Sequence, residues 1–78
     1  MDKSKNLKNK LSLGRCIKIL RKQRSLTQEG LAVQAGVSYT TLTKIENEAI
    51  KNPSFESIAA IAKGLSISLD ELTQKVSS

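Results

Sequence analysis

The chain has 78 residues, of which 38% are hydrophobic, and this length fits one small domain. With one Phe, one Tyr and no Trp, the composition favours packed helices with an aliphatic core over a sheet sandwich. Histidine is absent, which excludes a His-containing zinc site and a His-based catalytic triad, and the single cysteine cannot form an intramolecular disulfide.

The formal net charge is +6, and it is distributed unevenly. Nine of the 13 Lys and Arg residues precede Ser25, against the single acid Asp2, which gives +8. The remainder carries four bases and six acids, which gives −2. Such a basic segment indicates a polyanionic partner, and its plainer interpretation is a solvated tail.

Residues 1–10 are polar and contain four lysines, and we expect a flexible arm ahead of a single domain at residues 11–78. The arm either follows the phosphates of a polyanionic partner or only adds solubility, and the sequence leaves both open. It does not resemble a secretory signal, and no apolar run approaches the roughly 20 residues that span a bilayer. We therefore expect a cytosolic or nucleoid-bound protein that makes no membrane contact.

Helical periodicity predicts a first helix over residues 12–24, with Ser12 as its N-cap. Arg21 falls at the edge of the apolar face, half buried and in need of a partner. Cys16 is expected to fill the core as a small hydrophobic residue. The residues expected on the inward face are Leu13, Cys16, Ile17, Leu20 and Arg24.

A second helix is predicted over residues 28–34, capped by Thr27. Its expected buried residues are Leu31, Ala32 and Ala35. Gly30 is unusual inside a helix, where it costs about 1 kcal/mol relative to Ala. Either the backbone approaches something closely there, or the helix tolerates the cost. Gly36 is suited to the positive φ that ends a helix.

A third helix is predicted over residues 38–47, with Ser38 as its cap and Leu42 and Ile45 pointing inward. Its outward side carries hydroxyls, an aromatic ring, an amide and a cation but no carboxylate: Tyr39, Thr40, Thr43, Lys44 and Asn47. Glu46 falls at the core boundary beside Leu42. We expect it to form an ion pair with Arg21 that ties the third helix to the first.

The fourth helix is predicted over residues 55–63, capped by Asn52 or Ser54, with Gly64 as its C-terminal breaker. Its expected apolar face is Phe55, Ile58, Ala59, Ala62 and Leu65, with Ile61 at the edge. Ser68 and Glu71 then form an S-x-x-E capping box that opens a fifth short helix. That helix has Leu69, Leu72 and Val76 on or near one side.

Several motifs together resemble the lambdoid phage repressor and Cro helix-turn-helix family, also called XRE-like. They are Thr27-Gln28-Glu29, Leu31-Ala32, Ala35-Gly36-Val37-Ser38 and Ile45-Glu46-Asn47, with Pro53-Ser54-Phe55 and residues 68–72 in register. The resemblance implies an all-α, compact five-helix domain whose second and third helices form the helix-turn-helix. Many family members have Glu where Gly30 stands and Gly where Glu48 stands. The carboxylate of Glu48, near the segment implied to contact phosphates, would repel DNA, so we expect it to turn away.

By the same resemblance, the third helix enters the major groove and Tyr39, Thr40 and Lys44 face the bases, with Thr43 beside them. Lys can donate to guanine, and a Thr methyl can contact the thymine methyl. The implied phosphate contacts are Thr27, Gln28, Ser38, Asn47, Lys51, Asn52, Ser54 and Phe55.

The family usually binds palindromic operators as dimers, so we expect a homodimer on double-stranded DNA. Leu69, Leu72 and Val76 would supply a modest dimer contact, or they belong only to the core of one chain. We expect no catalysis, metal, cofactor or small-molecule ligand, because the sequence has no paired carboxylates on one face and no P-loop. Without an effector domain, a regulator of this kind would respond to concentration and dimerisation. The alternative is an antitoxin or coactivator whose helix-turn-helix binds protein.

Overall fold

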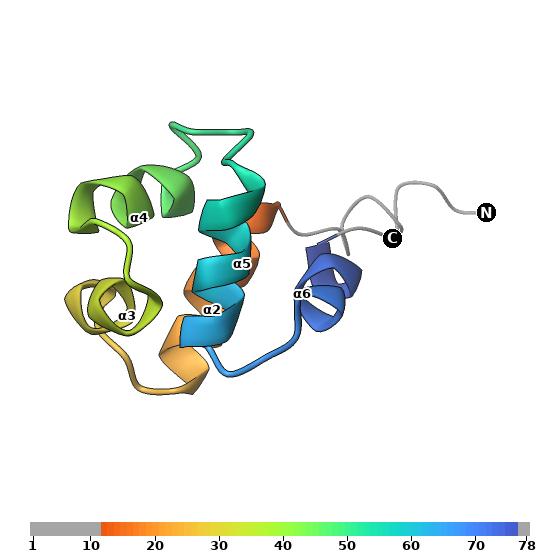
Figure 1. Cartoon of the computed structure of the whole chain (residues 1–78), viewed down its shortest axis with the longest axis horizontal. Coiled ribbons are helices and arrows are strands. Elements are labelled where there is room, and N and C mark those ends of the chain that lie inside the picture. The colour runs from red at the N-terminus through yellow and green to blue at the C-terminus, as the bar shows by residue number, and fades with distance from the viewer. Residues whose placement is uncertain (1–11, 77–78) are drawn as a thin grey trace.

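The computed structural model describes residues 12–76, and their regular structure is entirely helical. The helices are α2 (Leu13–Gln23), α3 (Gln28–Ala35), α4 (Tyr39–Glu46), α5 (Phe55–Gly64) and α6 (Leu69–Val76). In Figure 1, α3 and α4 lie at one end of the molecule and α6 at the other, with α2 and α5 between them. The predicted five-helix fold is confirmed, while the predicted arm at residues 1–10 lies outside the described residues.

Each of the five helices begins at a side-chain hydroxyl that accepts a hydrogen bond from the backbone N–H three residues later. This bond satisfies one of the N–H groups that have no partner at a helix start. Ser54, and not Asn52, caps α5. At α6 the capping box is complete, because the Glu71 carboxylate accepts from the Ser68 N–H in return. The caps are Ser12, Thr27, Ser38, Ser54 and Ser68.

One aliphatic core joins all five helices. Burying each large aliphatic side chain stabilises the fold by about 1.5–3 kcal/mol. Two of the buried side chains, Leu42 and Ile45, come from α4 and fix which of its sides faces outward. The fully buried side chains are Cys16, Ile17, Leu31, Leu42, Ile45, Ile61, Leu65 and Leu72.

Two predicted helix faces are wrong in part. Arg24 is exposed, because α2 ends at Gln23 and Arg24 forms its C-cap beyond the core. Phe55 is 70% exposed, whereas Ile61 is fully buried. The inward side of α5 is centred on Ile61 and Leu65, so that Phe55 lies at its margin in the exposed first turn.

The prediction that Gly64 breaks the fourth helix is also wrong, because Gly64 forms the last residue of α5. It packs against α3: a Cβ on Gly64 would lie 2.9 Å from the Cβ of Ala35 and 3.0 Å from its backbone nitrogen. The missing side chain therefore allows α3 and α5 to approach. The turn that follows takes its positive φ of 61° at Ser66.

None of the helices in residues 12–76 is long and apolar enough to cross a membrane.

Candidate nucleic-acid interface

The outward side of α4 carries the side chains that the sequence assigned to it. Tyr39 is 49% exposed, and Thr40, Lys44 and Asn47 are exposed too. Thr43 is half-buried, and its hydroxyl donates to the Thr40 carbonyl oxygen at 2.9 Å. No carboxylate of residues 12–76 lies within ion-pair distance of Lys44. The side chain of Lys44 is therefore free to bind an anion or a base edge.

The turn before α4 sets where this helix begins. Gly36 takes the left-handed conformation, with φ 73°, as predicted. Ser38 accepts from the Thr41 N–H at 3.0 Å and donates to the Thr41 hydroxyl at 2.8 Å. The first turn of α4 thus has a fixed start, next to Tyr39 and Thr40.

A buried ion pair holds α4 to the rest of the fold. Arg21 Nε donates to Glu46 Oε2 at 2.8 Å and Nη2 donates to Oε1 at 3.1 Å, which confirms the predicted pair. Arg21 Nη1 also donates to the Leu26 carbonyl oxygen at 2.8 Å. The two parallel bonds fix the relative orientation of α2 and α4, because such a fork accepts only one geometry.

Gln28 joins this pair, a contact that sequence reasoning missed. Its amide nitrogen donates to Glu46 Oε1 at 3.0 Å, so α3 is held by the same carboxylate. One of the two amide hydrogens is used in this way, and the second remains for another acceptor. Gln28 and Glu46 are 18 residues apart, and no local pattern reports a contact at that separation.

Gly14 was also missed, and it determines how closely α2 approaches α4. A Cβ at this position would overlap the carbonyl oxygens of Ile45 and Glu46. The only sequence signal was a glycine inside the first turn of a helix. Gly30 has no comparable neighbour: a Cβ there would meet only Thr27 Oγ1, at 3.2 Å, and Leu26. Gly30 therefore marks no close approach of another helix, and a Cβ there would crowd only the hydroxyl that caps its own helix.

The segment between α4 and α5 places Lys51, Asn52 and Ser54 at the surface. It starts at Glu48, whose φ of 66° is the conformation that the family's glycine would adopt without strain. The Glu48 carboxylate accepts a hydrogen bond from the Ser12 hydroxyl at 2.9 Å. It therefore points to the start of α2.

The predicted dimer residues do not form one exposed patch. Leu72 is fully buried within the chain, so its assignment to a dimer surface is wrong. Leu69 and Val76 are half-buried and keep some exposed area. The reason is that α6 packs on α2 and α5 through the side that the helical pattern had marked as apolar.

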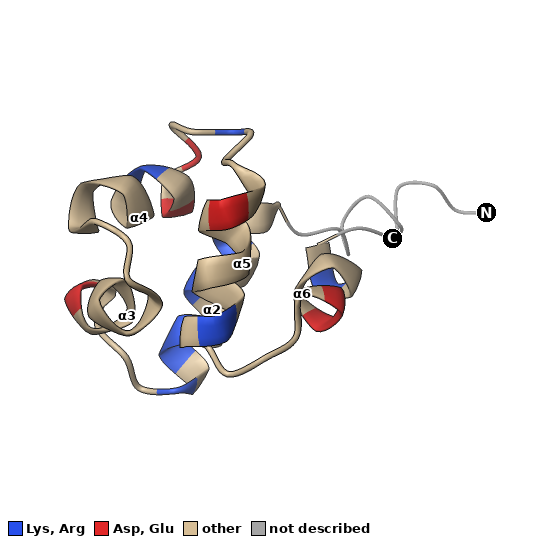
Figure 2. Ribbon diagram, viewed as in Figure 1, with Lys and Arg blue, Asp and Glu red and all other residues tan. Residues whose placement is uncertain are grey.

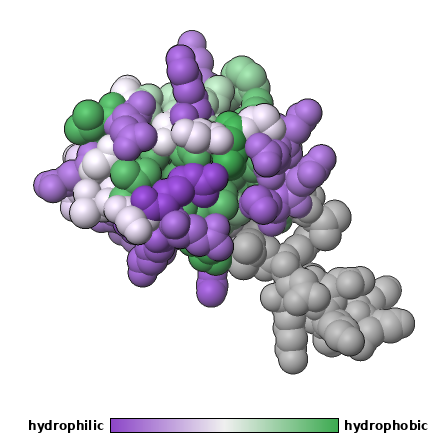
Figure 3. Space-filling model, turned by 90° about the horizontal axis from the view of Figure 1, so that it is seen from below, coloured by the Kyte–Doolittle hydropathy of each residue, from purple (hydrophilic) through white to green (hydrophobic). Residues whose placement is uncertain are grey.

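The positive charge of the described residues is concentrated on one helix (Figure 2), whereas apolar and hydrophilic side chains are mixed on the face that Figure 3 shows. In Figure 2 the basic residues of the described chain are concentrated on α2. Figure 3 shows the face seen from below, where an apolar area is broken up by hydrophilic side chains.

Comparison with known proteins finds a helix-turn-helix family, a transcriptional regulator and a repressor. A helix-turn-helix family model matches residues 17–72. The chain is 37% identical over 60 residues to the HTH-type transcriptional regulator SlrR of Bacillus subtilis (strain 168), which covers 77% of this chain and 40% of that protein. It is 37% identical over 62 residues to the immunity repressor protein of Bacillus phage phi105, covering 80% and 42%. The chain thus spans about two fifths of the length of these relatives.

Among solved structures, the fold is similar to that of SinR from Bacillus subtilis, described as the master regulator for biofilm formation, in a crystal structure of its complex with DNA. The TM-score is 0.73 at 31% identity, over 78% of this chain and 97% of that one.

Proposed function

The chain belongs to the helix-turn-helix family of transcriptional regulators, and on that premise we propose that it represses transcription by binding a specific sequence of double-stranded DNA. The observation that carries the proposal is the outward side of α4, which has exposed hydrogen-bonding groups, no carboxylate, and a lysine that forms no ion pair within residues 12–76. The similarity of the chain to a phage immunity repressor supports the assignment as a repressor.

Base reading is assigned to Tyr39, Thr40, Thr43 and Lys44, with α4 in the major groove. Lys44 can donate to guanine O6 and N7, and the Thr40 methyl can contact a thymine methyl. Thr43 uses its hydroxyl hydrogen on the Thr40 carbonyl oxygen, so it can offer a methyl group and an acceptor to a base. Tyr39 can stack on a thymine methyl or donate to a phosphate.

Phosphate contacts are assigned to the start of α3, the end of α4 and the segment after it. Gln28 retains one amide hydrogen for a phosphate oxygen. The hydroxyl oxygens of the caps accept backbone N–H groups, which leaves the other N–H groups of the helix starts for phosphates. The assigned residues are Thr27, Gln28, Ser38, Asn47, Lys51, Asn52, Ser54 and Phe55.

A homodimer on a palindromic operator in a prokaryotic cytoplasm completes the proposal, with half-sites about 34 Å apart. Leu69 and Val76 keep exposed area that a second copy can cover. Because Leu72 is unavailable, we expect this contact to be weak without DNA.

Selection of bound sites from a random pool of duplexes tests the proposal. We expect enrichment of an inverted repeat whose halves are about ten base pairs apart, centre to centre. Enrichment of a single half-site would contradict the dimer and keep the DNA-binding role. A pool that stays random would contradict sequence-specific binding and favour a protein partner for the same fold.

A further inference from the structure

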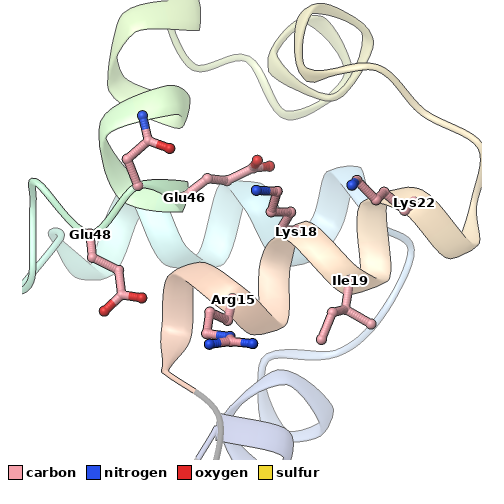
Figure 4. Close-up of a pocket in the computed structure, with 7 residues that line it drawn as sticks. Arg15, Lys18, Ile19, Lys22, Glu46 and Glu48 are labelled. Atoms are coloured by element: carbon pink, nitrogen blue, oxygen red, sulfur yellow. The ribbon is translucent and has the colours of Figure 1, made fainter.

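A hollow of about 410 Å³ opens between α2 and the end of α4 (Figure 4). Three cations from α2 line it: Arg15, Lys18 and Lys22, together called the α2 cationic flank. They are three and four residues apart, which places them on one side of a helix. All three are exposed, and Figure 4 shows Lys18 and Lys22 projecting from α2 on the side of Glu46.

The carboxylates in the hollow do not neutralise this flank. Glu46 is already paired with Arg21, which accounts for its charge. Glu48 accepts a hydrogen bond from Ser12 and lies in an ion pair with no cation of residues 12–76. Apart from the paired Glu46, the lining therefore carries three positive charges against the one negative charge of Glu48. The three cations lie near each other and form no ion pair in the described part of the chain.

The hollow is continuous with the proposed DNA interface. Asn47, assigned to a phosphate, lines it from the end of α4. Glu46, which also lines it, holds the amide of Gln28, another residue assigned to a phosphate. A DNA strand that meets Gln28 and Asn47 consequently passes beside the α2 cationic flank.

The spacing along α2 suits a nucleic-acid strand. The seven residue steps from Arg15 to Lys22 span roughly 10 Å along the helix, which corresponds to about three nucleotides at the axial rise of one strand. Flexible lysine side chains act as point charges and need no exact geometry to meet phosphates.

We propose that the α2 cationic flank binds the backbone phosphates of duplex DNA beside the base pairs that α4 reads. This inference rests on the proposed function and adds a second, sequence-independent contact surface to it. The flank contributes affinity for any duplex and no discrimination among sequences.

The test measures the salt dependence of binding to a mixed-sequence duplex of about 25 base pairs, by fluorescence anisotropy over roughly 50–200 mM salt. Log K falls linearly as log salt rises, and each phosphate contact adds about 0.9 to the magnitude of that slope. The double variant Lys18→Gln/Lys22→Gln should lower the slope by about two per bound chain. On a specific site the affinity should fall by the same factor as on the mixed duplex.

Lys63→Gln/Lys75→Gln is the matched control, because it removes the same charge from exposed lysines on α5 and α6 that do not line the hollow. The control should keep the wild-type slope. An unchanged slope in the flank variant would overturn the inference, and so would an equal fall in both variants, since the position of the charge would then be irrelevant. Wild-type protein that binds no duplex even at low salt would instead contradict the proposed function.

Circular dichroism separates lost contacts from lost folding. Gln and Lys have similar helix propensities, so the flank variants should melt like the wild type. If the double variant unfolds, the single variants Lys18→Gln and Lys22→Gln should each lower the slope by about 0.9. Two unchanged slopes in folded single variants would overturn the inference.

Discussion

Replacing Glu46 by Ala removes the carboxylate to which α2 and α3 both bind. Arg21 loses two hydrogen bonds, at 2.8 and 3.1 Å, and Gln28 loses one at 3.0 Å. Arg21 is only 7% exposed in the wild-type structure, so in the variant most of its charge stays buried, with a single bond to the Leu26 carbonyl oxygen. The variant therefore has a buried, unpaired charge and a small cavity at the same place.

Breaking a buried ion pair by removing one partner costs about 3–5 kcal/mol. A domain of this size has roughly 5–15 kcal/mol of stability, so the loss is a large share of the total. Each 1 kcal/mol corresponds to about 4–8 °C for 60–100 residues, which predicts a fall in the melting temperature of at least about 12 °C. Urea and thermal unfolding followed by far-UV circular dichroism measure both quantities.

The exposed acid Glu56 provides the control, because Glu56→Ala removes a carboxylate that has no partner in the described chain. Its melting temperature should fall by far less than that of Glu46→Ala, because Glu56 loses only its attraction to the positive end of the α5 dipole. In addition, the double variant Arg21→Met/Glu46→Leu should recover most of the lost stability, since it leaves no buried charge. A cost below about 1 kcal/mol for Glu46→Ala would refute the assignment of Arg21–Glu46 as a buried structural pair.

Substitutions at three further positions test separate parts of the fold. Both Glu48→Gly and Glu48→Ala lose the Ser12 bond, but only glycine relieves the positive φ, so Glu48→Gly should raise stability by about 1 kcal/mol in urea unfolding and Glu48→Ala should not. Gly64→Ala should lower stability by about 1–3 kcal/mol, because the new Cβ meets α3; an unchanged melting curve would contradict the close approach. Burial raises the pKa of the Cys16 thiol, so folded protein should react with iodoacetamide far more slowly than protein in urea. The same shift contributes stability that is present below the unfolded thiol pKa of about 8.5 and is lost as the pH rises above it, and Cys16→Ala should remove that contribution.

Local sequence patterns were sufficient to predict where the helices start and which side of α4 faces outward. Each cap depends on a hydroxyl and a backbone N–H three residues apart, so Ser12, Thr27 and Ser38 could be assigned from spacing alone. The Arg21–Glu46 pair followed from two charged residues at the margins of two apolar faces, and the structure has it.

Contacts between helices were less accessible to sequence reasoning. Gly14 and Gly64 look like helix-weakening residues, and their use as close-approach points depends on which helix packs opposite. The prediction placed Phe55 on the apolar face and Ile61 at its edge, whereas Phe55 is exposed and Ile61 is buried. A ten-residue helix allows its apolar face to be centred in more than one way. For Leu72, the helical pattern could show an apolar side but not whether the chain itself covers that side.

The most direct test of base reading by α4 compares Thr40→Ala and Lys44→Ala on a selected operator and on a mixed-sequence duplex. Affinity for the operator should fall by about 1–3 kcal/mol for each variant, while affinity for the mixed duplex stays nearly unchanged. Thr73→Ala and Lys63→Ala, which change exposed residues on α6 and α5, should leave both affinities as they are. Equal losses on the two duplexes would contradict base reading by α4 and reduce Thr40 and Lys44 to phosphate contacts.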